Sequence, residues 1–174
     1  MCGIVGFVGE EKAKEIIIDG LKKLEYRGYD SAGIAVSDND VVVVKEKGRI
    51  ANLQTEVNKE NPQGTVGIGH TRWATHGVPD KTNAHPHKSM NGVVTLVHNG
   101  IIENYIELKN DLISKGYEFV SQTDTEVIAQ LFDSLFDGDA LNTLIKTAHK
   151  LEGSYAVAML VRGYEDKVFA MNKD

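Results

Sequence analysis

The amino-acid sequence predicts an α+β fold in which packed β-sheets are covered by helices. Strand-like segments occur early, midway and late in the 174 residues, and segments with helical periodicity are grouped between them. Residues 154–161 are apolar on both faces, which is typical of a strand buried between two layers. The early strands, and likewise the late strands, follow one another closely enough to pair as hairpins.

Composition and length indicate one globular domain. Hydrophobic residues make up 41% of the chain and charged residues 25%, which is ordinary for a soluble domain. A net charge of -6, without a run of more than two basic residues, argues against nucleic acid as a partner. No apolar run approaches the roughly 18 residues that a membrane span needs, and no secretory signal is present. We therefore expect a cytoplasmic protein without a membrane partner.

In the first half of the chain we expect strands separated by two helices. Short apolar runs predict strands over residues 4–8 (buried), 34–36, 41–45 and 66–70, the middle two forming a hairpin. Helical spacing joins the apolar residues Ala13, Ile16, Ile17, Leu21 and Leu24, and then Ile50, Leu53 and Val57. Residues 25–33 are polar and rich in glycine, and they indicate a loop.

The second half is predicted to hold a long loop, three strands and three helices. The loop covers residues 71–90, and the strands cover residues 93–98, 154–161 and 168–171. Asn104 is placed to cap the first helix, which Gly116 closes. A capping box over 123–126 precedes the second helix. The third helix is predicted from the spacing of Leu141, Leu144, Ile145, Ala148 and Leu151.

The chemistry of the chain centres on Cys2, its only cysteine, which also excludes an intrachain disulfide. Removal of Met1 would place a free α-amine on the Cα that carries the thiol. An α-amine is a moderate base near neutral pH, so Cys2 would bring its own nucleophile and general base. The alternative at this point is a cysteine that follows the initiator methionine by chance.

Two further segments hold residue types that perform chemistry. A loop as long as 71–90 is functional or disordered, and its Trp, Arg and His residues argue against disorder. The pair Asn99-Gly100 follows a strand and can offer two N–H donors to an oxyanion. The alternative for this pair is a type I′ hairpin turn. We expect no metal site, because His85 and His87 lack a third ligand at a zinc-like spacing, and we expect His70, His98 and His149 to be structural.

Six motifs, in order, resemble the class II glutamine amidotransferases, which use an N-terminal nucleophile. Within that class they are most similar to the glutaminase domain of the glucosamine-6-phosphate synthase family, the glutamine–fructose-6-phosphate aminotransferases. The motifs are residues 2–6, 26–33, 70–77, 83–87, 97–104 and 121–127. Glutamine phosphoribosylpyrophosphate amidotransferases share the Cys-Gly start and the Asn-Gly pair. Trp73 after Arg72, and Tyr29-Asp30 after Gly28, look more like the glucosamine enzymes.

The resemblance implies a fold and a catalytic set. The fold would be a four-layer αββα sandwich of the N-terminal-nucleophile hydrolase type. Cys2 would attack the side-chain amide of glutamine through a thioester, while Asn99 and Gly100 would bind the oxyanion. The reaction would release ammonia without a cofactor.

The resemblance also implies a pocket for the zwitterionic end of glutamine. Arg72 would hold the α-carboxylate and Asp124 the α-ammonium. From the residues alone, Arg72 could equally form a surface ion pair and Asp124 a helix cap. Residues implied to contact substrate or gate ammonia are Trp73, Thr75, His76 and Gly77. Arg27 would support the nucleophile or face further domains.

The resemblance covers the whole chain, residues 1–174, as a glutaminase domain that stops before the family's domain ends. Fructose 6-phosphate would bind to sugar-isomerase domains absent from these residues, in a full-length homo-oligomer. Two alternatives remain open. The chain could be the glutaminase domain of another class II amidotransferase, serving phosphoribosylamine or asparagine synthesis. It could also be a non-catalytic binding domain that retains Met1.

Overall fold

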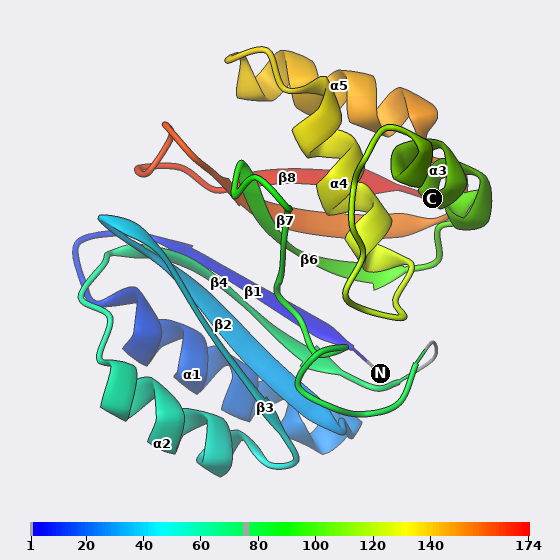
Figure 1. Cartoon of the computed structure of the whole chain (residues 1–174). Coiled ribbons are helices and arrows are strands. Elements are labelled where there is room, and N and C mark those ends of the chain that lie inside the picture. Colours follow the sequence, from blue (N-terminus) through cyan, green and yellow to red (C-terminus); the bar gives the residue numbers. More distant parts are fainter. Residues whose placement is uncertain (1, 75–76) are drawn as a thin grey trace.

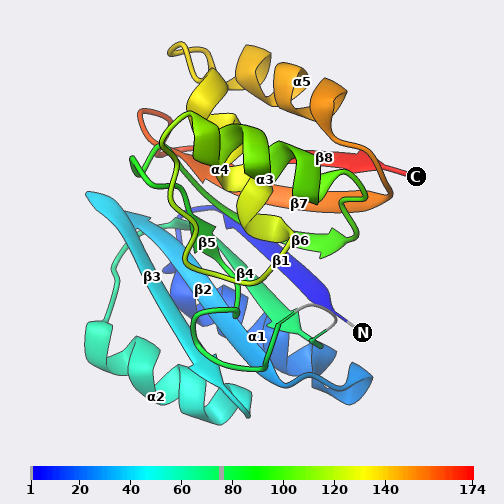
Figure 2. The same ribbon diagram turned by 45° about the vertical axis from the view of Figure 1, so that its right-hand side comes forward.

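Two antiparallel sheets lie face to face between outer layers of helices (Figure 1). The computed structural model describes residues 2–74 and 77–174. Turned by 45°, the molecule again shows helices on the outer face of each sheet (Figure 2). This arrangement confirms the four-layer αββα sandwich.

The first sheet is built from the early part of the chain. Its strands, in spatial order, are β1 (Gly3–Val8), β4 (Val66–Arg72), β2 (Ser31–Asp38) and β3 (Asp40–Lys47). Helices α1 (Ala13–Leu24) and α2 (Ile50–Glu60) cover its outer face, and a short 3₁₀ turn, η1 (Glu25–Arg27), follows α1. Because β1 pairs with β4 from Gly3 opposite Thr71 onward, Cys2 lies beside the end of β4.

The second sheet is built from the later part. Its strands, in spatial order, are β5 (His87–Lys88), β6 (Val94–Gly100), β7 (Tyr155–Val161) and β8 (Phe169–Lys173). Helices α3 (Tyr105–Ser114), α4 (Thr125–Leu135) and α5 (Ala140–Lys150) cover this sheet. Within the described ranges, no helix is long and apolar enough to cross a membrane.

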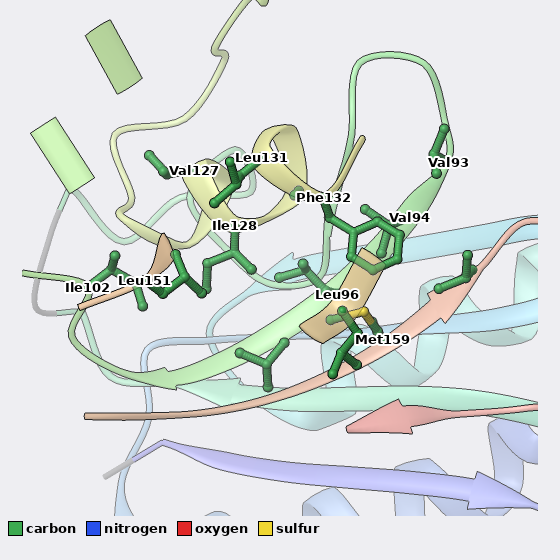
Figure 3. Packing of buried hydrophobic residues seen from close by; sticks show 14 of the residues in the cluster. Val93, Val94, Leu96, Ile102, Val127, Ile128, Leu131, Phe132, Leu151 and Met159 are labelled. Carbon is green, nitrogen blue, oxygen red and sulfur yellow. The ribbon is translucent and has the colours of Figure 1, made fainter. Parts of the chain in front are cut away.

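Apolar side chains fill the interface between each sheet and its helices. Between α4 and the second sheet, Phe132, Ile128 and Leu96 are fully buried (Figure 3). Between α1 and the first sheet, Ile17 and Leu21 are also fully buried. Burial of a side chain of this size contributes roughly 1.5–3 kcal/mol, so these two interfaces hold the helices on the sheets.

The interface between the two sheets changes character along its length. At one end, Val66 and Ile68 of β4 pack with Val97 of β6. Two residues further along β4, His70 contacts Asn99 of β6 across the same interface. Alternate residues of a strand share one face, so one face of β4 is first apolar and then polar.

The opposite face of β4 is nearly bare, which lets α1 lie against the strand backbone. A Cβ added to Gly67 or Gly69 would come within 2.8 or 2.3 Å of the Ile17 side chain. Carbon atoms in favourable contact are about 3.5–4.0 Å apart. A side chain at either position would therefore separate α1 from β4.

Strand boundaries differ from the prediction where polar residues continue a ladder. β4 extends to Arg72 and β2 begins at Ser31, because these two residues pair with each other. β6 continues through Asn99 and Gly100, which pair with β7, so the type I′ turn is wrong. The prediction missed β5 altogether. β1 is an edge strand rather than a buried one, with Val8 55% exposed.

Two predicted helix caps are also wrong. Asn104 precedes α3 without a capping bond, and its amide instead bonds the backbone near the end of α5. The box over 123–126 does not form, because Glu126 accepts from the backbone N–H groups of Val120 and Ser121 at 3.0 and 2.7 Å. In both cases a backbone group outside the cap replaced the local bond.

The buried face of α5 differs in part from the predicted one, although Leu144 and Leu151 are buried as expected. Leu141 and Ile145 are 58% and 46% exposed, whereas Thr143 and Thr147 are fully buried. Each threonine hydroxyl donates to a carbonyl one turn earlier in the helix. Because its polar atom is satisfied locally, threonine can replace an apolar residue on the buried face.

Candidate active site

The start of β1 and the ends of β4 and β6 surround one cavity of about 580 Å³. The predicted site residues that line it are Cys2, Arg27, Arg72, Trp73, Asn99, Gly100 and Asp124. Gly77 lies beside the Asn83 side chain and is not among the lining residues. Thr75 and His76 lie outside the described residues. The fold therefore brings together predicted site residues from both halves of the chain, from Cys2 to Asp124.

Cys2 lies where two cavities meet. It lines the cavity just described and a second one of about 570 Å³, which reaches β7 and β8. Its side chain is half-buried, and the backbone N–H of Trp73 donates to Sγ at 3.3 Å. Arg27, in η1, lines the same two cavities. These contacts fix the sulfur beside the end of β4 while leaving it accessible to a bound molecule.

Asn99 and Gly100 complete β6 on the wall of the same cavity. The Asn99 Oδ1 atom lies 2.8 Å from Nε2 of His70. Gly100 has a φ of 118°, and a Cβ there would meet the carbonyl oxygen of Ser154 at 2.2 Å. Only glycine fits that backbone, so the strand can turn out of the sheet at the cavity wall.

Two buried charges of opposite sign line the cavity. Arg72 is 4% exposed and Asp124 is 5% exposed. Asp124 precedes α4 without capping it, and its Oδ2 accepts from the backbone N–H of Ile102 at 2.9 Å. Arg72 donates from Nη1 to the carbonyl of Val78 at 3.4 Å. These two hydrogen bonds hold a positive and a negative group at the wall of one cavity. A zwitterionic ligand requires such a pair of opposite charges.

Asp30 ties the residues after β4 to the sheet. Its backbone N–H donates to the carbonyl of Arg72 at 2.8 Å, and its Oδ2 accepts from the N–H of Ala74 at 2.6 Å. Trp73 lies between these two anchors and is 53% exposed. Its ring covers Gly28, where an added Cβ would lie 2.9 Å from the indole. Asp30 thereby holds Trp73 at the rim of the cavity.

A second tie holds the other end of this segment. The Asn83 Nδ2 atom donates to the carbonyl of Val78 at 3.0 Å, and Asn83 Oδ1 accepts from the backbone N–H of Gln122 at 2.8 Å. Gln122 lies two residues before Asp124. Asn83 therefore connects the segment that follows Arg72 to the segment that holds Asp124.

Four histidines occupy the polar end of the sheet interface. Those that line the cavity are His70, His85 and His98, and His87 lies edge-on to His85. Burial lowers the pKa of His70 to about 3 and holds the pKa values of His85 and His87 well below the usual value. Burial also lowers the pKa of His98, which the nearby Asp124 carboxylate partly opposes. These rings are therefore neutral at pH 7.

Hydrogen bonds fix the orientation of the rings. The backbone N–H of His98 donates to Nδ1 of His85 at 3.2 Å, which leaves the His85 proton on Nε2. That nitrogen is 3.2 Å from the Thr125 hydroxyl, which is 2.8 Å from Nδ1 of His98. Among residues 2–74 and 77–174, no group of three His, Cys, Asp or Glu is placed to hold a metal ion.

The sequence predicts structural roles for His70 and His98, and it places Asp30 and Asn83 in family-like motifs without predicting a role for either. A signal for His70 was present: it precedes Arg72 by two residues, so the two share one face of β4. No comparable local signal identified Asp30 or Asn83. The partners that connect them to the rest of the site are Gln122 for Asn83 and Ala74 for Asp30, which lie 39 and 44 positions away in the sequence.

Comparisons with known proteins agree with this geometry. A family model described as a glutamine amidotransferase domain matches residues 70–174. The chain is 53% identical over 175 residues to the glutamine–fructose-6-phosphate aminotransferase (isomerizing) of Clostridium perfringens. It is 54% identical over 178 residues to the same enzyme of Staphylococcus aureus. The alignments cover 100% and 99% of this chain but only 29% of each relative.

Solved structures of lower identity share the fold. The glutamine phosphoribosylpyrophosphate amidotransferase of B. subtilis, in complex with ADP and GMP, matches with a TM-score of 0.79 at 29% identity. That match covers 92% of this chain and 35% of the other. An allosteric regulatory enzyme of purine biosynthesis matches with a TM-score of 0.86 at 28% identity, over 99% of this chain and 37% of the other.

Proposed function

The chain belongs to the glutamine amidotransferase domain family, and we propose that its cavity hydrolyses the side-chain amide of glutamine. The observation that supports this most strongly is the convergence of Cys2, Asn99, Arg72 and Asp124 on one cavity. These residues supply a nucleophile, an oxyanion donor and a pair of opposite charges. Each feature matches one part of the glutamine molecule.

The proposed reaction begins at Cys2 once Met1 has been removed. The α-amine takes the thiol proton as Sγ attacks the amide carbon, and a tetrahedral oxyanion forms. Asn99 Nδ2 and the Gly100 N–H stabilise this oxyanion; one such donor is typically worth about 2.7–4 kcal/mol. The amine then gives its proton to the leaving nitrogen, so ammonia departs and a γ-glutamyl thioester remains. Water cleaves the thioester to glutamate and free thiol.

The buried charges orient the other end of the substrate. The Arg72 guanidinium can form two parallel bonds with the α-carboxylate, and Asp124 accepts from the α-ammonium. Trp73, Thr75, His76 and Gly77 belong to the segment that we propose closes over glutamine. Arg27 supports the nucleophile from η1. A closed segment would keep water away from the ammonia that is formed.

For the acceptor we propose fructose 6-phosphate, converted to glucosamine 6-phosphate in a longer cytoplasmic protein that forms homo-oligomers. The support for this acceptor is the name of the relatives that are more than 50% identical. The acceptor would bind outside residues 1–174. The fold relatives at 28–29% identity leave phosphoribosylamine synthesis as the second candidate. An assay of the full-length protein with each acceptor would decide between them.

Processing of Met1 gives a direct test of the mechanism. While Met1 is attached, the Cys2 nitrogen is an amide without a basic lone pair, so we expect that form to fold and remain inactive. The processed form should react at Cys2 with a glutamine-like diazoketone, and intact mass would report one adduct. Only the processed form should release glutamate from glutamine. Equal labelling of both forms would exclude the α-amine as base, and no labelling of either would favour a binding domain.

A further inference from the structure

Beside Asn99, in the wall of the same cavity, lies a buried histidine that the proposed reaction uses neither as acid nor as base. The His70 side chain is fully buried, and its ring stacks on that of His85 with centroids 4.1 Å apart and an interplanar angle of 18°. The ring is neutral at pH 7 because burial disfavours its charged form. A neutral imidazole has a single N–H, so the position of that proton decides what His70 can do.

The contact between His70 and Asn99 allows two arrangements of protons. Either His70 Nε2–H donates to Asn99 Oδ1, or the amide is turned and its NH₂ group donates to Nε2. The second arrangement places the ring proton on Nδ1, which is buried and makes no hydrogen bond of ordinary geometry among the described residues, the backbone of His98 being its nearest polar neighbour. Buried N–H groups without an acceptor are rarer than buried acceptors without a donor. The first arrangement is therefore favoured.

This arrangement determines which half of the Asn99 amide faces the reacting atoms. With Oδ1 engaged by His70 at 2.8 Å, the Nδ2 group lies on the opposite side of the amide. We propose that His70 is a positioning residue that holds the Asn99 NH₂ group toward the oxyanion. The proposal rests on the oxyanion role of Asn99 given above. Without His70, the amide could present its oxygen instead and repel the developing negative charge.

The surroundings of His70 suit a positioning role. His85, on which the ring stacks, is itself fixed by the backbone N–H of His98 and by Thr125. His70 also lies in the middle of a β4 segment that pairs on both sides, with Ile4 of β1 and Gly33 of β2. The donor is thus set before substrate arrives, which is how preorganised groups lower a barrier without reorganisation.

Two substitutions distinguish the effect of the His70–Asn99 hydrogen bond from the effect of the space that the His70 ring fills. His70→Leu removes the donor, whereas His70→Gln places an amide N–H near the position of Nε2. We expect His70→Leu to lower kcat for glutamine hydrolysis by about 10–100-fold, as for other supporting residues of a site, with KM nearly unchanged. His70→Gln should recover most of that loss. His87→Leu is the matched control, because it removes a buried histidine of the same group without a contact to Asn99.

A double-mutant cycle with Asn99→Ala tests the proposal itself. If His70 acts only through Asn99, adding His70→Leu to Asn99→Ala should cause no further loss of kcat. A multiplicative loss, or equal defects in the Leu and Gln variants at matched melting temperature, would show a merely structural role. Full turnover by the Asn99→Ala single variant would refute the oxyanion role of Asn99 in the proposed function. It would leave the observed contact between His70 and Asn99 unaffected.

The tautomer can be observed without any assay of activity. In ¹⁵N-labelled protein, the ring nitrogens of His70 should show the proton on Nε2 at pH 7. A proton on Nδ1 would overturn the proposal, because the Asn99 amide would then be turned the other way. This measurement needs no variant, so it remains decisive if His70→Leu fails to fold.

Discussion

The two ends of the sheet–sheet interface are built on the same strands and differ in what they do. At one end, Ile68 of β4 faces Val97 of β6 in an apolar cluster. At the other end, two residues along each strand, His70 faces Asn99. The geometry of the strands is the same at both ends, and only the residue types change.

The two ends show how one pair of strands can supply both stability and chemistry. Apolar contacts at one end require no orientation and contribute through buried area. Polar contacts at the other end are directional, because each donor needs a particular acceptor. The apolar end can therefore fix the spacing of the sheets, while the polar end uses that spacing to aim an amide. Four variants test whether the two ends act separately.

The largest expected effect is on stability and comes from the apolar end. Ile68→Ala removes a fully buried side chain and should lower the free energy of unfolding by about 2–5 kcal/mol. Urea unfolding would measure it. Glutamine turnover by the folded fraction should remain near normal. Val8→Ala, at an exposed position near the end of β1, is the control and should change stability by less than about 0.5 kcal/mol. If Ile68→Ala lost as much turnover as Asn99→Ala, the two ends would have to be treated as one functional unit.

Asn99→Ala should produce the reverse pattern. Loss of the oxyanion donor should lower kcat for glutamine hydrolysis by about 10²–10³-fold, while glutamine still binds and the melting temperature changes little. Steady-state kinetics and isothermal titration with glutamine would separate these effects. Near-normal turnover in this variant would remove Asn99 from the reaction.

Arg72 should affect binding more than chemistry. Loss of a charged hydrogen-bond donor is worth about 1.5–3 kcal/mol, so Arg72→Ala should raise KM for glutamine by about 10–100-fold with a smaller change in kcat. Arg72→Lys should restore binding only in part, because an ammonium lacks the planar fork of guanidinium. An unmutated protein that accepts a glutamine analogue without its α-carboxylate equally well would contradict this assignment.

The last prediction concerns the pH dependence of stability. The pKa of His70 is about 3 in the folded protein and near 6.5 in the unfolded chain. As pH falls below 6.5, the unfolded chain binds the proton first, so the free energy of unfolding decreases until about pH 3. One such histidine gives a slope of up to about 1.4 kcal/mol per pH unit.

The buried His85 and His87 act in the same direction. His70→Gln should flatten the dependence in urea unfolding between about pH 7.5 and 4.5. His149→Gln, at an exposed position of α5, is the control. Identical slopes in wild type and His70→Gln would show that His70 does not contribute.

The sequence predicted the elements well because their apolar periodicity follows from packing alone. It also placed Cys2, Arg72 and Asp124 in one site, through motifs whose order matched a known family. It failed where a distant partner replaced a local one. Asn104 and Glu126 have the residue types of helix caps, yet their side chains bond to backbone groups outside those caps.

The strand boundaries failed for a related reason. Ser31 and Arg72 have no strong strand signal, and their membership depends on pairing with each other. His70 could be placed on the same face as Arg72 by counting, but its bond to Asn99 depends on how two sheets approach. A short stretch of sequence does not determine the spacing between two sheets. Local patterns therefore predict elements, and the contacts between sheets decide the site.

The bare outer face of β4 has a consequence for mutational screens. Gly67 and Gly69 alternate with Ile68 and His70 along the strand, so a side chain on the outer face would press β4 away from α1 and toward the second sheet. Such a variant would displace the polar contacts without touching the cavity. A screen scored on enzyme output would then report these two glycines as catalytic positions. Loss of activity alone would thus not distinguish a glycine that sets the spacing between elements from a residue that takes part in the reaction.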